Sequence, residues 1–255
     1  MLKLFASDEV DVPQMAGLLR SDPALSAQLL AVANSAFYGS KHHIDNMARA
    51  ILVLGFERAK ALTMTVAMGS FLKHCAKSKA MENCWRHGLA AALVAEELAP
   101  LFEFPKDQAY IAALTHDIGR LGLLMAYDDL YSPLLETPHE THADCLESER
   151  TLFEMDHCQA GLWLTERWGF PPPYSRAVGC HHDDLPGRRQ DLASLTHASC
   201  LLADALGFPA VVINQAPSTA EIVEQLPSDP WHRYIFDTET LQNRITEHLS
   251  TVTLQ

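Results

Sequence analysis

The chain has 255 residues, of which 48% are hydrophobic, and this is enough apolar material for one large core or two smaller ones. It contains 32 acidic and 19 basic residues, which gives a formal net charge of −13. Broad electrostatic binding to nucleic acid needs many lysines and arginines that displace counterions. The composition argues against that class of function, and we expect no direct binding to nucleic acid.

The N-terminal sequence MLKLFASDEVDVPQM lacks the basic flank and the long apolar stretch of a secretory signal. No uninterrupted apolar run is long enough to cross a bilayer. The six cysteines form no CxxC pair, and most of them lie in apolar or helical contexts, so reduced thiols are expected. We therefore expect a cytoplasmic protein that does not associate with a membrane.

Apolar residues recur at helical spacing through most of the chain, and strand signals are almost absent. One helix is predicted to start at Pro23, because the first turn of a helix tolerates proline. The apolar residues Leu25, Leu29 and Val32 follow at spacings of three to four residues. The proline-rich stretch 209–235 is predicted to be irregular. The predicted helices, in chain order, cover residues 10–20, 23–36, 44–54, 56–72, 80–99, 107–125, 145–154, 156–168, 173–182, 190–206 and 238–250.

This pattern predicts an all-α protein built as a two-lobed helical bundle. A small N-terminal lobe is expected over residues 1–75, and a larger lobe that includes the C-terminal helix is expected over residues 76–255. The two lobes are expected to form one unit.

The dipeptide His116-Asp117 lies in the sequence AALTHDIGRLGLL, which otherwise has the composition of a buried helix. Burying a charge is costly unless the charge is paired or binds a metal. The pair is therefore either a set of metal ligands or a tightly hydrogen-bonded pair in the core.

Other imidazoles occur on neighbouring predicted helices, and helical bundles build metal sites from side chains that converge on their interior. A mixed set of histidine and aspartate with open positions suits Fe, Mn or Zn and can activate a water for hydrolysis. The alternative is that each histidine is a satisfied polar group of the core or of a helix end. The candidate ligands are His87, His116, Asp117, His157, His181 and His182.

These residues resemble a known family. The order of His87, HDIG at 116–119, His157 and His181-His182 is similar to that of the HD superfamily of metal-dependent phosphohydrolases. The stretches DPALSAQLLAVANSAFYG, WRHGLAAALVAEELA and DHCQAGLWLTERWGFP resemble the HDOD domain, an HD-related output domain of bacterial signalling. The resemblance covers nearly the whole chain. It implies an all-α fold in which 1–75 is the N-terminal lobe of an HDOD domain and 76–255 is the HD-like lobe.

The resemblance also implies roles for individual residues. HD enzymes place the first ligand where His87 stands and the HD pair where His116 and Asp117 stand. In the HD-GYP branch, which hydrolyses diguanylate, further histidines bind a second metal. The positions that match those histidines are His157, His181 and His182.

Two departures from the pattern matter. The late aspartate that closes the HD site falls on Cys200, and the GYP loop after the two histidines is absent. Cysteine is a poor substitute for carboxylate toward Mg or Mn. Asp204, one helical turn on, is not expected to replace it, and Arg120 is expected in a salt bridge on a helix surface.

The leading hypothesis is a bacterial signal-transduction module of the HDOD type that binds a protein or a small ligand with little or no catalysis. Its expected partners are a sensor kinase, a response regulator or a cyclic-dinucleotide enzyme, with a nucleotide ligand or a homodimer as further expectations. The alternative is a metal-dependent phosphohydrolase of a nucleotide or cyclic dinucleotide, in which Asp117 is catalytic. One or two divalent ions, Fe, Mn, Zn or Mg, would occupy the site.

Overall fold

The structure, a computed structural model, describes Met15, Leu19, Ile44 and the ranges 23–34, 46–75, 78–183, 191–227 and 237–253. Within these residues every regular element is a helix, and the single β-type pairing is an isolated bridge between His139 and Ile213. The predicted all-α fold is confirmed. Of the predicted helix 10–20, only Met15 and Leu19 are described, and both are helical.

None of the described helices combines the length and the apolarity that crossing a membrane requires. Among the cysteines whose side chains the structure describes, five carry free thiols: Cys84, Cys145, Cys158, Cys180 and Cys200.

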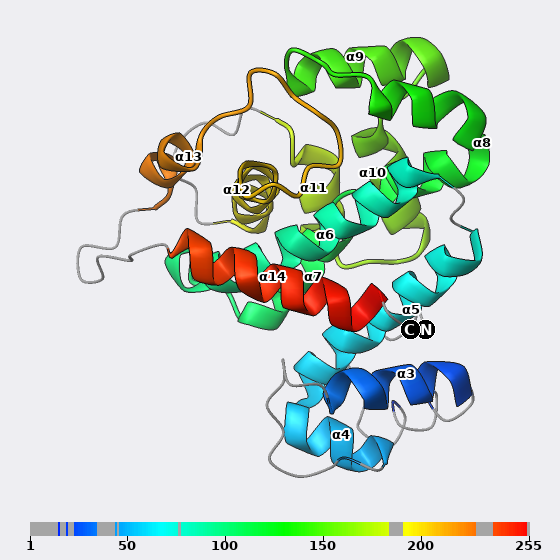
Figure 1. The fold of residues 1–255 in the computed structure, drawn as a ribbon, viewed down its shortest axis with the longest axis vertical. Coiled ribbons are helices and arrows are strands. Elements are labelled where there is room, and N and C mark those ends of the chain that lie inside the picture. The colour runs from blue at the N-terminus through cyan, green and yellow to red at the C-terminus, as the bar shows by residue number, and fades with distance from the viewer. Residues whose placement is uncertain are drawn as a thin grey trace. The chain divides into compact units, whose positions relative to one another are not determined.

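Two compact units make up the chain, residues 1–75 with 242–255 and residues 76–241. The first unit contains the helices drawn in blue and cyan in Figure 1 and the later part of α14. Its helices are α3 (Pro23–Ala33), α4 (Met47–Leu54), α5 (Phe56–Cys75) and, from residue 242, α14 (Thr238–Thr253).

The side chain of Asn34 joins the end of α3 to the segment before α4. Its amide nitrogen donates to the carbonyls of Leu30 and Ile44 at 2.9 and 2.8 Å, and its oxygen accepts from the Ile44 N–H at 2.8 Å. Asn46 then caps α4 by accepting from the Arg49 N–H at 2.8 Å. The Asn46 bond satisfies a backbone N–H that the first turn of α4 leaves unpaired, and the Asn34 bonds tie Ile44 to the end of α3.

A buried histidine in the first unit makes its stability depend on pH. Burial lowers the pKa of His248 to about 4, with smaller contributions from the positive charges of Arg58 and Arg244. Between pH 6.5 and pH 4, His248 binds a proton in the unfolded chain but not in the folded chain. The free energy of unfolding therefore falls as the pH is lowered through this range. We expect the free energy of unfolding of His248→Gln to fall by roughly 3 kcal/mol less than that of the wild type over this pH range. Urea unfolding at pH 7 and pH 4 measures the difference, and parallel losses in the two proteins would contradict the assignment.

The second unit contains nine helices within its described residues. They are α6 (Lys79–Leu98), the 3-10 helix η2 (Ala99–Phe102), α7 (Lys106–Thr115), α8 (Ile118–Glu136), α9 (His142–Phe153), α10 (His157–Arg167), α11 (Pro172–Cys180), α12 (Leu192–Ala205) and α13 (Thr219–Gln225).

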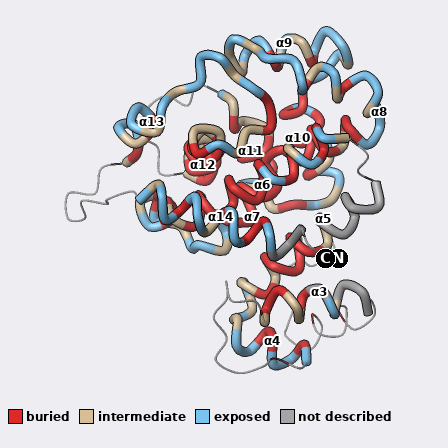
Figure 2. The backbone as a smooth tube through the Cα atoms, viewed as in Figure 1, coloured by how far each residue is buried: buried red, intermediate tan, exposed pale blue. Residues whose placement is uncertain are grey.

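Five of these helices form a closed ring. Helix α6 contacts α8, α8 contacts α10, α10 contacts α11, α11 contacts α12, and α12 returns to α6, while α7 packs against both α6 and α12. Fifteen of the 20 residues of α6 are buried, so this helix runs through the interior of the unit, as its mainly red tube in Figure 2 shows. Its small residues between Gly88 and Ala92 allow neighbouring helices to approach closely.

The prediction of one helix over 107–125 was wrong, because the chain breaks between α7 and α8 at His116-Asp117. The His116 ring donates from Nδ1 to the Ala113 carbonyl at 2.6 Å, and the His116 N–H reaches the same oxygen at 3.4 Å. A continuing helix would offer that carbonyl to the Asp117 N–H. Asp117 instead adopts φ −94° and ψ 20°, and α8 starts at Ile118 and reaches Glu136 across a kink at Tyr127, which has φ −143° and ψ 42°.

The prediction that all of 209–235 is irregular was also wrong, since α13 lies within it. Ser218 and Glu221 form a capping box at its start: the Glu221 N–H donates to the Ser218 hydroxyl, and the Ser218 N–H donates to the Glu221 carboxylate. The sequence Ser-Thr-Ala-Glu carries this signal and was outweighed by the surrounding prolines.

Candidate metal centre

The candidate ligands of the sequence come together inside the ring of helices. His87 lies in the middle of α6, His116-Asp117 join α7 to α8, His157 begins α10, His181-His182 follow α11, and Cys200 lies on α12. All of them are buried except His182, which is half-buried. Two groups have potential ligand atoms within 4.8 Å of one another: Asp117 with His157, His181 and His182, and His87 with His116 and Cys200.

Four of the imidazole rings are held by their Nδ1 atoms. Nδ1 of His116 and of His181 lie 2.6 and 2.7 Å from the carbonyl oxygens three residues earlier in their own chain segments. Nδ1 of His87 lies 2.9 Å from the Phe208 carbonyl, and Nδ1 of His157 lies 2.7 Å from a Glu149 oxygen. Carbonyls and carboxylates only accept hydrogen bonds, so each Nδ1 is the donor and each Nε2 is free to act as a ligand.

The four Nε2 atoms point toward one another in two pairs. Those of His87 and His116 are 3.1 Å apart, and those of His157 and His181 are 3.3 Å apart. When both rings carry their proton on Nδ1, two lone pairs face each other at these distances and repel. A cation between them removes the repulsion, and a metal ion or an additional proton can supply it.

The Asp117 carboxylate lies between the two pairs. Its Oδ1 is 3.3 Å from Nε2 of both His157 and His181, and its Oδ2 is 3.8 Å from Nε2 of His116 and 4.0 Å from that of His87. Although Asp117 precedes the first turn of α8, its side chain makes no capping hydrogen bond there. The carboxylate is directed at the histidines and offers one oxygen to each pair.

These distances fit a bound metal ion. Zinc–nitrogen bonds of about 2.0–2.1 Å at tetrahedral angles place two ligand nitrogens about 3.3–3.4 Å apart. The separations of 3.1 and 3.3 Å agree with this value. Imidazole and carboxylate are ligands for Zn, Fe and Mn, so the donor set suits a borderline divalent ion.

The ionisation states also suit ligation. Burial lowers the pKa of His116 to about 3, so its ring is neutral at physiological pH. Burial alone would raise the pKa of Asp117, but the Arg120 guanidinium and the ring of His116 outweigh it and hold the pKa well below its usual range. An ionised carboxylate therefore stands beside the neutral imidazole of His116.

His87 differs from its neighbours. Burial opposes its charged form, but the Asp204 carboxylate and the Cys200 thiol outweigh burial and raise the pKa of His87 well above 6.5. In the metal-free protein a proton on its Nε2 can then be donated to Nε2 of His116. A metal ion that binds at this position must displace that proton, so metal binding and protonation compete.

A second layer of polar residues supports His157. The Glu149 carboxylate accepts from the His157 ring and, at 2.9 Å, from its backbone N–H, and it lies 3.4 Å from the Arg120 guanidinium. The surface position predicted for Arg120 was wrong, because it is buried between Glu149 and Asp117, which it contacts at 3.1 Å. The sequence of α9 contains no signal that separates Glu149 from its exposed neighbour Glu147.

Asp204 contacts His87 on the Nδ1 side of its ring, opposite the candidate ligand atom Nε2. Its carboxylate lies 3.1 Å from Nδ1 of His87 and 3.4 Å from Nε2 of His142. It therefore orients the His87 ring without approaching the Nε2 atoms, as expected for a residue one turn beyond the closing position. His142, to which the sequence assigned no role, also stacks on His182 with ring centroids 4.6 Å apart.

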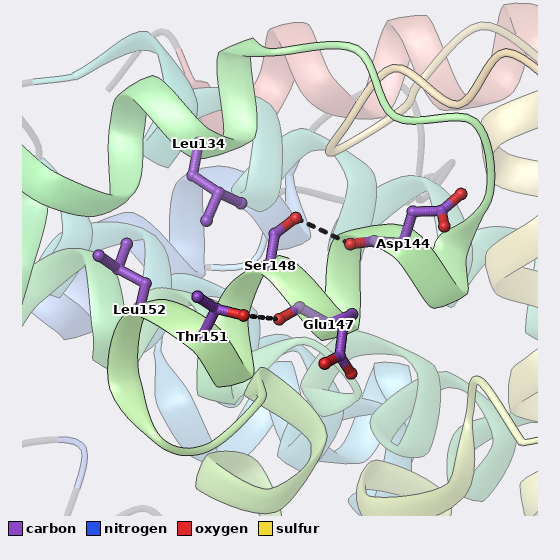
Figure 3. Close-up of a pocket in the computed structure, with 6 residues that line it drawn as sticks. All are labelled: Leu134, Asp144, Glu147, Ser148, Thr151 and Leu152. Atoms are coloured by element: carbon purple, nitrogen blue, oxygen red, sulfur yellow. Dashed lines mark hydrogen bonds between the residues drawn. The ribbon is translucent and has the colours of Figure 1, made fainter.

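An open pocket of about 550 Å³ between α8 and α9 contains none of these ligands. Figure 3 shows its lining residues Leu134, Asp144, Glu147, Ser148, Thr151 and Leu152. The hydroxyls of Ser148 and Thr151 donate to carbonyls one turn earlier on the same helix, both at 2.9 Å. These two hydroxyls are satisfied within α9.

An all-α ring of helices around buried His and Asp residues defines an HD-like protein. A family model for the HDOD domain matches residues 1–184, and the chain belongs to that family. A curated protein of Treponema pallidum (strain Nichols), described as "Uncharacterized protein", is 24% identical over 180 residues, which are 69% of this chain. The chain spans about a third of that relative, 34% of its length.

Solved structures share the fold. An HDOD domain protein of unknown function from Geobacter sulfurreducens matches with a TM-score of 0.69 and 20% identity, over 99% of this chain and 88% of its own. A protein of Shewanella amazonensis SB2B, provisionally named a phosphohydrolase, matches with a TM-score of 0.71 and 17% identity over the same shares, 99% and 88%. A protein of Marinobacter aquaeolei VT8, provisionally named a signal transduction protein, matches with a TM-score of 0.68 and 21% identity over 99% and 56%.

Proposed function

We propose that this chain is a metal-binding signalling module of the HDOD type, in which a buried divalent ion ties the helices of the HD-like unit together. The observation that carries the proposal is the convergence of four Nε2 atoms on Asp117 while every Nδ1 is held by an acceptor. Ligands from four segments meet there, so ions held by the two groups would link α6, α10 and α11 to the junction of α7 and α8. Output would come from binding a protein or a small ligand.

Burial supports a structural role for the ion. His116, His157 and His181 are 0% exposed and Asp117 is 4% exposed. A catalytic ion keeps a coordination position open to water and substrate, whereas a structural ion is enclosed by its ligands. The replacement of the closing carboxylate by Cys200 also counts against hydrolysis with Mg or Mn.

The partner is proposed by class. A sensor kinase, a response regulator or a cyclic-dinucleotide enzyme would fit the output role of an HDOD domain, and a nucleotide or a second copy of the chain are further candidates. The signalling name given to the Marinobacter protein agrees with this class.

A second candidate function is metal-dependent phosphohydrolysis of a nucleotide or cyclic dinucleotide. The two oxygens of Asp117 face two histidine pairs, an arrangement that would suit two ions bridged by one carboxylate. Bound ions would supply positive charge that stabilises a phosphoryl group under attack by water. The phosphohydrolase name of the Shewanella protein agrees with this alternative.

Metal analysis of protein purified without chelator tests the proposal. We expect at least one ion per chain in the wild type and a loss of affinity of more than about a hundredfold in Asp117→Asn, because a direct ligand contributes more than the residues behind it. Asp129→Asn removes an exposed carboxylate from the same helix and is expected to keep the ion. At a metal concentration one hundred times the Kd, the ion should stabilise the fold by about 2.7 kcal/mol.

Assays with nucleotides and cyclic dinucleotides then separate the two functions. The signalling module predicts no turnover with Mn, Fe or Zn. Turnover that is lost in Asp117→Asn but kept in Asp129→Asn would establish the hydrolase instead. A wild type that binds none of these ions would refute both metal-based functions.

A further inference from the structure

The three residues His87, His116 and Cys200 form a compact set of nitrogen and sulfur atoms. Sγ of Cys200 lies 3.5 Å from Nε2 of His87, which lies 3.1 Å from Nε2 of His116. The three side chains come from α6, the end of α7 and α12, and none of the three residues is more than 2% exposed. The position that a carboxylate occupies in HD enzymes thus holds a sulfur that faces the two ring nitrogens.

The distances match a metal ion bound by sulfur and nitrogen. A zinc–sulfur bond of about 2.3 Å and a zinc–nitrogen bond of about 2.0–2.1 Å at a tetrahedral angle place the two ligand atoms about 3.6 Å apart. The observed separation of Cys200 Sγ from His87 Nε2 is 3.5 Å. The sulfur therefore has the position of a ligand with respect to the histidine pair.

Helix α12 supports this geometry at two points. Cys200 and Asp204 are four residues apart and lie on the same face of the helix. The sulfur of Cys200 lies beside Nε2 of His87, and the carboxylate of Asp204 lies 3.1 Å from Nδ1 of the same ring. Helix α12 thus supplies the candidate ligand Cys200 and also Asp204, the acceptor that orients the His87 ring. A metal-bound histidine usually donates its other ring N–H to such an acceptor.

We propose that Cys200 is a thiolate ligand and that it makes the His87–His116–Cys200 subsite selective for a borderline ion of the Zn²⁺ class over Mn²⁺ or Mg²⁺. This inference rests on the proposed metal-binding function and adds the identity of the ion class. When the ion binds, the thiol loses its proton to solvent and the sulfur forms one bond to the metal. Thiolate ligands favour zinc, whereas Mg and Mn favour oxygen. The Asp117, His157, His181 and His182 group has only nitrogen and oxygen donors, so the two subsites differ in chemistry.

A second buried thiol provides a matched control. Sγ of Cys158 lies 3.6 Å from Nε2 of His157 and 3.8 Å from Nδ1 of His181. That Nδ1 is the nitrogen held by the Val178 carbonyl, so Cys158 lies beside the His181 ring and away from the direction of its Nε2. Cys158 therefore lies near the free Nε2 of His157. Unlike Cys200, however, its sulfur does not join a described group in which all potential ligand atoms lie within 4.8 Å of one another.

Cobalt substitution tests the proposal, because a Co²⁺ thiolate bond gives a charge-transfer absorption in the near ultraviolet that nitrogen and oxygen ligands do not give. We expect this band in the Co²⁺-loaded wild type and in Cys158→Ser, and we expect its loss in Cys200→Ser. In Cys200→Asp the band should also disappear, while the ratio of Zn²⁺ to Mn²⁺ affinity should fall by about tenfold or more as oxygen replaces sulfur. Circular dichroism confirms that each variant keeps its helices.

Each outcome decides the question. A wild type that binds Co²⁺ without the band would overturn the role of Cys200 and leave the metal-binding function standing, even if every variant failed to fold. A band that survives in Cys200→Ser and disappears in Cys158→Ser would assign the thiolate to the other cysteine. Failure of the wild type to bind Co²⁺, Zn²⁺ or Mn²⁺ would refute the proposed function itself.

Discussion

Gly119→Ala is expected to destabilise the HD-like unit by at least about 3 kcal/mol. A Cβ atom at Gly119 would stand 1.9 Å from the carbonyl oxygen of His157, 2.7 Å from the backbone nitrogen of Gly161 and 2.9 Å from the carbonyl carbon of His157. These are backbone atoms of α10, so no side-chain rotation relieves the contact. Helices α8 and α10 would have to separate, and that movement would displace His157 from Asp117.

Urea unfolding followed by circular dichroism measures the loss, and Gly122→Ala is the matched control one turn further along α8. There a new Cβ would meet only the side-chain atom Cδ1 of Leu164, at 3.0 Å. Leu164 can move, and alanine is the better helix former by about 1 kcal/mol. We expect Gly122→Ala to remain within about 1 kcal/mol of the wild type. Equal stability of the two variants would show that α8 and α10 do not approach as closely as described.

Glu149→Gln is also expected to destabilise the HD-like unit strongly, because one buried carboxylate interacts with three residues. It accepts from the ring and the backbone N–H of His157, it pairs with Arg120 at 3.4 Å, and it accepts from the Tyr131 hydroxyl. The glutamine amide lacks the negative charge that faces the buried guanidinium of Arg120. Its NH₂ group would also face groups that donate a hydrogen bond to the carboxylate. Breaking a buried ion pair by changing one partner costs about 3–5 kcal/mol.

The same substitution should weaken metal binding by about 10–100-fold, since the carboxylate that orients His157 would be lost. Isothermal titration with Zn²⁺ measures this effect, and chemical unfolding measures the loss of stability. Glu147→Gln is the control on the same helix, where the carboxylate is 73% exposed and pairs with Arg150 at 3.6 Å. It is expected to change stability by less than about 0.5 kcal/mol. Similar losses in both variants would contradict the buried role of Glu149.

Most helices could be predicted from local sequence because helical periodicity is a local property. The chain between Pro23 and Ala33 and the chain between Leu192 and Ala205 fold much as their apolar spacing predicts. Helix ends that depend on a longer-range contact could not be predicted. At His116 the ring takes the carbonyl of Ala113, and this bond is accompanied by contacts of the same ring to His87 and His181 from two other helices.

The supporting residues of the candidate site were not visible in the sequence. Glu149 and Glu147 lie two residues apart on one charged helix, and only packing decides which faces the interior. Arg120 was expected at a surface for the same reason. The contact of Asp204 with His87 could not be predicted from the sequence, because it depends on the packing of α12 against α6.

The sequence by itself determined the helical class, the HDOD resemblance and the identity of the candidate ligands, because each of these depends on residue types at short spacing. Only the tertiary structure decided which atoms of those ligands meet. His87, His116, Asp117 and Cys200 span more than 110 positions of the chain, and their approach depends on the helix ring closing. That closure directs the Nε2 atoms inward, places Asp117 between two histidine pairs and brings the Cys200 sulfur to 3.5 Å from His87.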